Sequence, residues 1–243
     1  KHSIANRITL IQGPPGTGKT RMGCALLQAF IDETNLICGP SNAAADNLTK
    51  RFLPVVQERM KESKYHVVRF LSQNVMKSGK VDSDMGDLSF DAWVGHQSSI
   101  GKTNKSGRTQ WWKTTGTQLI NFVAATLALC GSEKLKAGGR FVDNIIHDEA
   151  GQATEPESLI PLQCLKQDGR MILIGDPMQL PPTVKSPSAL KHGLENSLLK
   201  RLSGIPGLQM ILLDVQHRML PMISSFPNKT FYAAKINDSA RAS

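Results

Sequence analysis

An eight-residue loop near the start of the sequence constrains the fold more than any other feature. It fits the pattern G-x-x-x-x-G-K-[ST] and consists of Gly13, Pro14, Pro15, Gly16, Thr17, Gly18, Lys19 and Thr20. A short apolar run over 7–12 precedes it and predicts a strand. After it, apolar residues recur with the spacing of one helix face, at Met22, Ala25, Leu26, Ala29 and Phe30. Strand, glycine loop and helix together predict a P-loop.

The residue types in this loop suit the phosphates of a nucleotide. Small residues allow backbone N–H groups to point inward, and the N-terminus of the following helix adds positive potential. Lys19 is expected to reach the β- and γ-phosphates, and Thr20 is expected to offer its hydroxyl to Mg²⁺. The loop therefore predicts a site for ATP and Mg²⁺ to which all eight of its residues contribute.

The order of the remaining elements indicates an α/β fold. Further strands are expected at 36–38, 65–71, 119–126, 141–147, 170–174 and 210–213. Helices are expected at 43–50, 154–165 and 188–202, with Pro54 breaking or restarting the first of these. Strands that alternate with helices favour a parallel sheet covered by helices on both faces. A chain of 243 residues, 40% of them hydrophobic, suits one large domain with an insertion.

A polar segment over 72–118 interrupts the pattern and predicts that insertion. It is rich in Ser, Gly, Thr, Lys and Asp, and we expect it to be mobile around Gly101 to Gly107. It contains two apolar islands, at 88–93 and at Trp111-Trp112. These tryptophans could pin the insertion to the body of the domain, which is the commoner role, or stack on nucleic-acid bases.

The charge and the cysteine content indicate which kinds of partner and which cellular compartment to expect. The net charge is +9, which suits a polyanionic partner. Between residues 50 and 80, eight Lys and Arg stand against two Glu, which fits either a solvated face or a nucleic-acid contact. The four cysteines contain no C-x-x-C pair, so we expect reduced residues inside the cell and no zinc site. No apolar run approaches membrane-spanning length, so no membrane partner is expected.

Polar residues follow two of the predicted strands. Asp148 comes directly after the strand at 141–147 and is expected to bind Mg²⁺, directly or through water. Glu149 is then expected to orient and deprotonate the attacking water. Gln179 follows the strand at 170–174 and could contact the γ-phosphate or that water. Ligands in parallel sheets collect at the carboxyl ends of strands, so these residues are expected to meet the glycine loop.

Five sequence blocks together resemble superfamily 1 helicases (superfamily 1B) of the nonsense-mediated-decay and senataxin type. They occur in the family's order, at 13–20, 39–48, 148–157, 175–182 and 216–221. The resemblance implies a RecA-like P-loop NTPase lobe that hydrolyses ATP and moves along single-stranded RNA or DNA in the 5′ to 3′ direction. It also implies that residues 1–243 are the first of two RecA-like lobes, with the second lobe beyond Ser243 and the adenine-recognition motif before Lys1.

The resemblance further assigns roles to single residues. It implies that four residues line the nucleic-acid track, namely Pro40, Ser41, Asn42 and Thr126. Arg218 is implied to reach the γ-phosphate, and His217 lies near the nucleotide base, where the family often has Tyr. His147 also departs from the family, which usually has an apolar residue before Asp148. The implied catalytic set is Lys19, Glu149, Gln179 and Arg218.

Two other functions compete with the helicase interpretation. An AAA+ ATPase can carry the same loop, but it normally places the Asp-Glu pair sooner than the 129 positions that separate Lys19 from Asp148. It would also have an Asn sensor where this chain has Gln179. The other alternative is a degenerate module that holds nucleic acid without turnover, and the intact site residues argue against it.

Overall fold

A seven-stranded sheet forms the centre of the computed structural model, which describes residues 6–61, 65–72, 74–75, 83–99 and 111–240. The strand order is β3-β4-β2-β5-β6-β1-β7, and all these neighbours pair in parallel, as the sequence predicted. The strands are β1 Ile8–Gln12, β2 Asn35–Gly39, β3 Val67–Arg69, β4 Phe122–Thr126, β5 Val142–His147, β6 Leu165–Gly175 and β7 Met210–Leu212.

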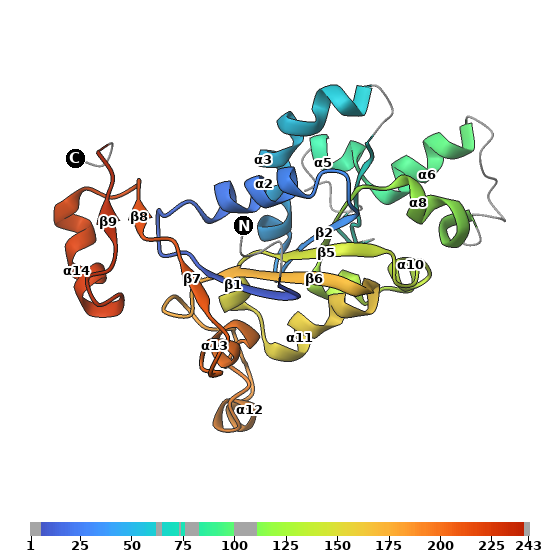
Figure 1. The fold of residues 1–243 in the computed structure, drawn as a ribbon. Helices are drawn as coiled ribbons and strands as arrows, with labels where there is room; N and C mark the ends of the chain where they lie inside the picture. The colour runs from blue at the N-terminus through green and yellow to red at the C-terminus, as the bar shows by residue number, and fades with distance from the viewer. Residues whose placement is uncertain (1–5, 62–64, 73, 76–82, 100–110, 241–243) are drawn as a thin grey trace.

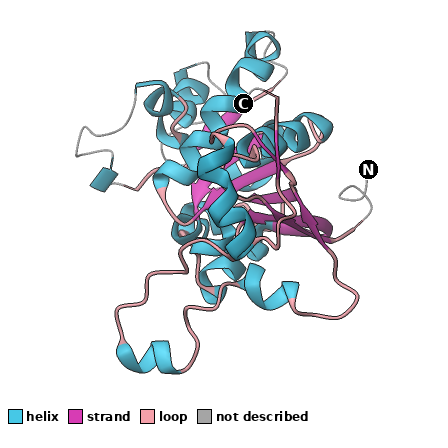
Figure 2. Cartoon of the chain, turned by 90° about the vertical axis from the view of Figure 1, so that its left-hand side faces the viewer, coloured by secondary structure: helices cyan, strands magenta, loops and turns pink. Residues whose placement is uncertain are grey.

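Helices cover both faces of this sheet (Figures 1 and 2). Successive side chains of a strand point to opposite faces, so Ile11 and Leu10 enter two different hydrophobic cores. The core around Ile11 includes side chains of α2 Lys19–Ala29 and α3 Asn42–Lys61. The core around Leu10 is closed by short helices, α9 Leu127–Cys130, α10 Glu133–Lys136 and α13 Leu198–Ser203, with α11 Glu155–Leu159 alongside. The predicted α/β architecture is therefore confirmed.

Three predicted helix limits were wrong, for different reasons. Helix α3 continues through Pro54 to Lys61, because Phe52 and Val56 on either side of the proline are buried in the core. The single helix expected at 188–202 is two helices, α12 Pro187–Lys191 and α13. Gly193 separates them with a φ of +80°, and the Ser197 hydroxyl accepts a new N-terminal hydrogen bond from the Lys200 N–H at 3.1 Å.

The helix expected at 154–165 is also shorter than predicted. It contains α11 and a 3-10 turn, Ile160–Cys164, after which β6 begins at Leu165. Pro161 lies in this turn and has no N–H to continue the α-helical hydrogen bonds.

The insertion packs against the β3 side of the sheet. Its described helices are α5 Ser83–Asp87, α6 Phe90–Ser99, a π-helical turn Trp112–Gly116 and α8 Thr117–Leu119. Trp112 is only 2% exposed, and its ring lies 5.2 Å from that of Phe90 and 5.5 Å from that of Phe141. Trp112 therefore pins the insertion to the core and is unavailable for stacking on bases. The stretch expected to be mobile, Gly101 to Gly107, lies outside the described residues.

The last described residues form a small βαβ unit that we call the C-terminal unit. Strands β8 Val215–Gln216 and β9 Asn237–Asp238 pair in parallel, apart from the main sheet, and α14 Pro221–Phe231 connects them. Met222 is 82% exposed and Phe226 is 70% exposed on this helix. In Figure 1 the unit lies to one side of the sheet, beyond β7.

Candidate nucleotide site

The glycine loop between β1 and α2 makes two turns that only glycine adopts easily. Gly16 and Gly18 have φ values of +80° and +88°, in the left-handed region. Between them, the backbone N–H and the hydroxyl of Thr17 both donate to the Pro14 carbonyl, at 3.2 and 2.8 Å. A Cβ on Gly16 would lie 2.7 Å from Cβ of Arg218, so close packing also excludes larger residues there.

Lys19 begins α2, and its side chain turns back over the loop. Its Nζ donates to the Gly13 carbonyl at 3.0 Å and lies 3.9 Å from Oε1 of Glu149. A Cβ on Gly13 would lie 2.1 Å from Cγ of Lys19, so this path requires glycine. The Gly13 N–H donates to the Gly175 carbonyl at 2.8 Å and fixes the loop to the end of β6. The ammonium group is thus held between the loop and the acidic pair.

The acidic pair directly follows β5. Burial of Asp148, and then the nearby charge of Glu149, raise the pKa of the Asp148 carboxyl to about 6. Its Oδ1 accepts from the Glu149 N–H at 3.0 Å, and no donor reaches Oδ2 from the residues that the structure describes. Glu149 has a φ of +53°, an unusual value for a non-glycine residue at a turn that brings its carboxylate to Lys19.

Asp148 and Thr20 are suitable ligands for Mg²⁺. Mg²⁺ prefers oxygen ligands, and these residues offer a carboxylate oxygen without a protein donor and a hydroxyl at the start of α2. A cation there would also offset the burial that disfavours the Asp148 charge. Over the described ranges, no three His, Cys, Asp or Glu side chains are grouped to hold a metal. Phosphate and water oxygens would therefore complete the coordination.

The segment after β8 is hydrogen-bonded directly to the loop. The His217 N–H donates to the Gly16 carbonyl at 2.9 Å. Oε1 of Gln216 accepts from the N–H groups of Arg218 and Met219, each at 2.8 Å, which sharply turns the chain. This turn sets the side chains of His217 and Arg218 against the same cavity as the loop.

One cavity of about 820 Å³ is lined by most of the predicted nucleotide-site residues, but not by Gly13, Thr17 or Asp148. It is lined by the four predicted catalytic residues, by His217 and by much of the loop, including Thr20. It is also lined by four residues that the sequence did not assign to the nucleotide, namely Arg21, Arg51, Ser239 and Ala240. Arg51 lies on α3 and the last two follow β9, so only the packing of distant elements brings them here. A separate cavity of about 660 Å³ beside α12 and α13 contains none of the predicted residues.

The predicted nucleic-acid residues lie at the same edge of the sheet but outside this cavity. They follow β2 or end β4, and these two strands are neighbours; the residues are Pro40, Ser41, Asn42 and Thr126. The hydroxyls of Ser41 and Thr126 accept hydrogen bonds at the N-termini of α3 and α9. Oδ1 of Asn42 accepts from Nη2 of Arg69 at 2.9 Å. Three of these side chains, those of Ser41, Asn42 and Thr126, thus already accept hydrogen bonds from the protein.

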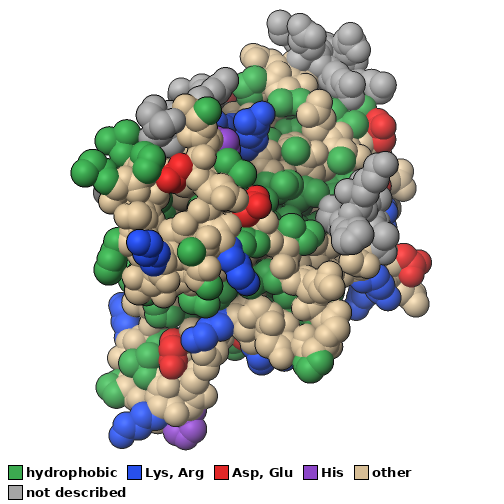
Figure 3. Space-filling model, turned by 60° about the vertical axis from the view of Figure 1, so that its left-hand side comes forward, with side chains coloured by type: hydrophobic (Ala, Val, Ile, Leu, Met, Phe, Trp, Pro, Cys, Tyr) green, Lys and Arg blue, Asp and Glu red, His purple; other side chains and the backbone are tan. Residues whose placement is uncertain are grey.

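The basic stretch between residues 50 and 80 divides into different environments. Arg69 is fully buried, and its Nε donates to Asp46 at 2.6 Å, so this arginine is part of the interior. Arg51 lines the nucleotide cavity. On the face seen in Figure 3, lysine and arginine side chains are scattered rather than gathered into one block. None of the helices among the described residues is long and apolar enough to cross a membrane.

Comparison with known proteins identifies the family. Two family models described as "AAA domain" match, AAA_11 at residues 1–118 and 99–187 and AAA_12 at residues 194–243. The "Regulator of nonsense transcripts 1 homolog" of Drosophila melanogaster is 30% identical over 98% of this chain and 21% of its own length. The "DNA polymerase alpha-associated DNA helicase A" of Schizosaccharomyces pombe is 36% identical over 97% of this chain and 38% of its own length. The "Probable helicase senataxin" of Homo sapiens is 27% identical over 96% of this chain and 12% of its own length.

A solved structure shows the same fold. It is titled "Complex structure of Arterivirus nonstructural protein 10 (helicase) with DNA" and matches 96% of this chain and 42% of its own, with a TM-score of 0.50 and 14% identity. The chain spans between about an eighth and two fifths of the length of the relatives named above. The chain belongs to the AAA domain family represented by AAA_11, within superfamily 1 helicases of the nonsense-mediated-decay and senataxin type.

Proposed function

We propose that this chain is the ATP-binding and ATP-hydrolysing lobe of a nucleic-acid-dependent helicase. The observation that carries the proposal is the single cavity in which Lys19, Glu149 and Arg218 meet over the glycine loop. Relatives named as helicases favour this function over the AAA+ alternative. Because the chain spans only part of those relatives, the activity of the whole protein belongs to this proposal.

The loop and its neighbours would hold ATP by its phosphates. Backbone N–H groups of the loop and the Lys19 ammonium would neutralise charge on the β- and γ-phosphates. Thr20 and Asp148 would hold Mg²⁺, which would supply positive charge beside the phosphates. His217 would lie near the base, where an imidazole ring can stack.

Three side chains would act on the transferred phosphoryl group. Glu149 would orient the attacking water and accept its proton, since its carboxylate lies 3.9 Å from Nζ of Lys19 at the phosphate end of the cavity. Gln179 would contact that water or the γ-phosphate, and Arg218 would stabilise the charge that develops. Positioning and charge neutralisation supply most of the catalysis in phosphoryl transfer.

The nucleic-acid part of the proposal concerns the neighbouring strand ends. Single-stranded RNA or DNA would run past the ends of β2 and β4, against Pro40, Ser41, Asn42 and Thr126. A second RecA-like lobe would close the ATP cavity, and movement would be 5′ to 3′, as the resemblance implies. A cytoplasmic or nuclear location goes with the proposal, because the four cysteines are free thiols.

The substitution Glu149→Gln tests the ATPase assignment in the longest natural chain that carries this sequence. We expect ATP binding to remain and the steady-state rate of hydrolysis to fall by about 10² to 10⁴-fold. The matched control is Glu33→Gln, the same change at the opposite edge of the sheet, where the carboxylate pairs with Arg170 at 2.8 Å. This control should hydrolyse ATP at the wild-type rate. Wild-type turnover in Glu149→Gln would remove Glu149 from the proposed chemistry.

A further inference from the structure

Asp176, at the end of β6, is the centre of a hydrogen-bond network that joins three parts of the molecule. The residue is only 3% exposed, and both of its carboxylate oxygens accept two donors. Oδ1 accepts from Nε2 of Gln12 and from the Met178 N–H, each at 3.1 Å. Oδ2 accepts from Nε2 of Gln179 at 2.9 Å and from the Tyr232 hydroxyl at 2.7 Å. Four donors account for the full hydrogen-bonding capacity of a buried carboxylate.

This network fixes which end of the Gln179 amide faces the nucleotide cavity. An ionised carboxylate only accepts hydrogen bonds, so the amide must turn an N–H toward Asp176. The carbonyl oxygen Oε1 then points away from Asp176, and no donor reaches it from the described part of the chain. Since Gln179 lines the cavity, this oxygen is free to accept a hydrogen bond from a water molecule there. The flipped amide would place two oxygens against each other and is excluded.

Tyr232 comes to this network from a separate part of the fold. It directly follows α14 in the C-terminal unit, whose two strands pair apart from the main sheet. Its side chain nevertheless lies beside the end of β6 and is buried there, 8% exposed. Burial, and then the hydrogen bond to Asp176, raise the pKa of the Tyr232 phenol, so the group stays a donor at neutral pH.

We propose that Tyr232 is a positioning residue for ATP hydrolysis, which acts through Asp176 to hold the Gln179 carbonyl toward the attacking water. This inference rests on the proposed function. Without the Tyr232 hydroxyl, Asp176 keeps three donors, but its Oδ2 accepts from Gln179 alone. This oxygen and the Gln179 amide can then change orientation together. Because Tyr232 belongs to the C-terminal unit, the contact also makes the orientation of Gln179 depend on how that unit sits against the sheet.

The test is Tyr232→Phe, with a matched control that the chain itself provides. Its only other tyrosine, Tyr65, is also buried and also donates to an aspartate, Asp32, at 2.7 Å, but away from the nucleotide cavity. ATP hydrolysis is measured with and without single-stranded RNA in the longest natural chain. We expect Tyr232→Phe to lower kcat about fivefold to tenfold with the KM for ATP changed by less than about twofold. Tyr65→Phe should change neither constant.

A double-mutant cycle with Gln179→Ala separates positioning from a general structural role. If Tyr232 acts through Gln179, the kcat loss from Tyr232→Phe disappears when Gln179 is already alanine. The same fold loss in both backgrounds, or wild-type kcat in Tyr232→Phe, would overturn the inference. Failure of the proposed function would be seen differently. A rate of ATP hydrolysis that does not change when single-stranded nucleic acid is added would contradict the helicase assignment. The effect of Tyr232→Phe on hydrolysis without nucleic acid could still be measured in that case.

Discussion

Polar side chains at the two edges of the main sheet differ in how fully the protein satisfies their hydrogen bonds. At the amino edge, where strands begin and which we call the closed edge, two buried asparagine amides use all their hydrogen-bonding groups on neighbouring protein groups. At the carboxyl edge, where strands end and which we call the open edge, several charged and polar groups near the nucleotide cavity have an atom without a protein hydrogen-bond partner among the described residues. The contrast shows that a polar cluster in this fold indicates a ligand only where its members leave hydrogen-bonding capacity unused.

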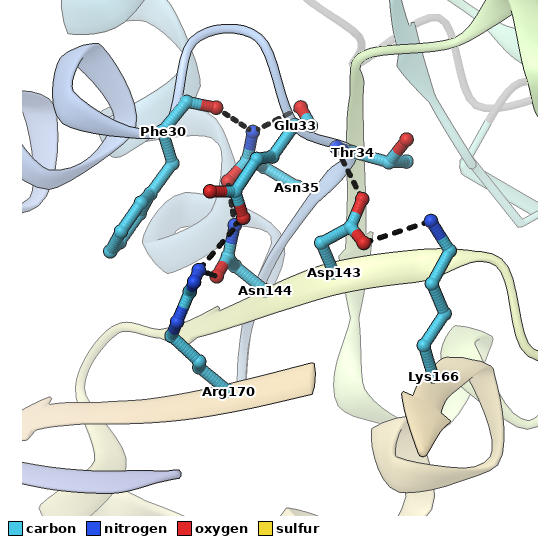
Figure 4. A network of polar contacts seen from close by, with 8 residues as sticks. All are labelled: Phe30, Glu33, Thr34, Asn35, Asp143, Asn144, Lys166 and Arg170. Atoms are coloured by element: carbon cyan, nitrogen blue, oxygen red, sulfur yellow. Dashed lines mark hydrogen bonds and ion pairs between the residues drawn. The ribbon is translucent and has the colours of Figure 1, made fainter. Parts of the chain in front are cut away.

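Figure 4 shows the amino edge, a closed network that joins the starts of β2, β5 and β6. Asn35 and Asn144 are fully buried, and the amide of Asn144 donates to Asn35 at 3.0 Å and to Glu33 at 2.9 Å. Arg170 donates to Glu33 at 2.8 Å and to the carbonyl oxygen of Asn144 at 2.9 Å. Each amide thus uses both its N–H groups and its oxygen, and the network holds three strands in register.

The carboxyl edge contains a similar mixture of charges without the same closure. Within the described ranges, no protein acceptor reaches the guanidinium groups of Arg51 and Arg218, and no donor reaches Oδ2 of Asp148 or Oε1 of Gln179. Lys19 has one short hydrogen bond and a 3.9 Å contact with Glu149. Unsatisfied groups of both signs around one cavity are what a bound nucleotide, its cation and a water molecule would use.

Removing Lys19, the central cation of the open edge, should have the largest effect on ATP binding. We expect Lys19→Ala to weaken ATP binding by about 10- to 100-fold, because a charge-assisted contact with phosphate is lost. The free energy of unfolding should hardly change, since the ammonium makes only one short protein contact. Equilibrium titration with a fluorescent ATP analogue measures the affinity. Unchanged affinity would remove Lys19 from the site.

Disrupting the network of the closed edge should lower the stability of the protein and leave ATP hydrolysis unchanged. Asn144→Leu leaves Arg170 and Asn35 each without one buried partner, so we expect the free energy of unfolding to fall by about 3 kcal/mol. Chemical denaturation measures this loss. The kcat for ATP, measured per folded molecule at low temperature, should stay at the wild-type value. A large loss of kcat with normal stability would contradict the division between the edges.

His147 is the last residue of β5, and its titration should affect stability only in acid. It is fully buried, neither ring nitrogen has a partner among the described residues, and burial lowers its pKa to about 3. The folded pKa lies below the unfolded value, so its contribution is complete above about pH 6.5 and is lost as pH falls. We expect His147→Leu to recover about 2.5 kcal/mol of unfolding free energy at pH 4.5. Asp148 titrates in both the wild-type protein and the variant, so it cannot cause a difference between them. If the unfolding free energies of the two proteins changed with pH in parallel, the assignment to His147 would be refuted.

The smallest effect is expected at the rim of the closed edge. The ion pair between Lys166 and Asp143 measures 2.8 Å, but the lysine side chain is 46% exposed. Lys166→Ala should therefore cost less than about 1 kcal/mol of unfolding free energy and leave ATP affinity unchanged. It is the control for Lys19→Ala, because both remove one ammonium group. A loss of affinity equal to that of Lys19→Ala would show that the two edges are not distinct in function.

The parts that the sequence predicted depend on short spans of chain. The loop, the Asp148-Glu149 pair and Gln179 each follow an apolar strand closely, so their place at one sheet edge follows from parallel pairing alone. The parallel sheet follows from the alternation of strands and helices. Helix limits were less certain, because packing of Phe52 and Val56 carried α3 through a proline.

The parts that the sequence could not predict depend on contacts between distant segments. Tyr232 reaches Asp176 across 56 positions, and Arg51 reaches the cavity because α3 packs beside α2. No local pattern distinguishes the asparagines of the closed edge from surface residues, since each finds its partner on another strand. The roles of the site residues stay predictions that the variants above address.

Titration of single-stranded RNA into a steady-state ATP hydrolysis assay tests the central claim most directly. The claim is that the open edge joins an ATP cavity to a nucleic-acid track at the ends of β2 and β4. In the longest natural chain that carries this sequence, we predict that hydrolysis rises with RNA concentration to a plateau. We also predict that Glu149→Gln abolishes the rise. A rate that stays constant across the titration, with single-stranded DNA giving the same result, would contradict the account.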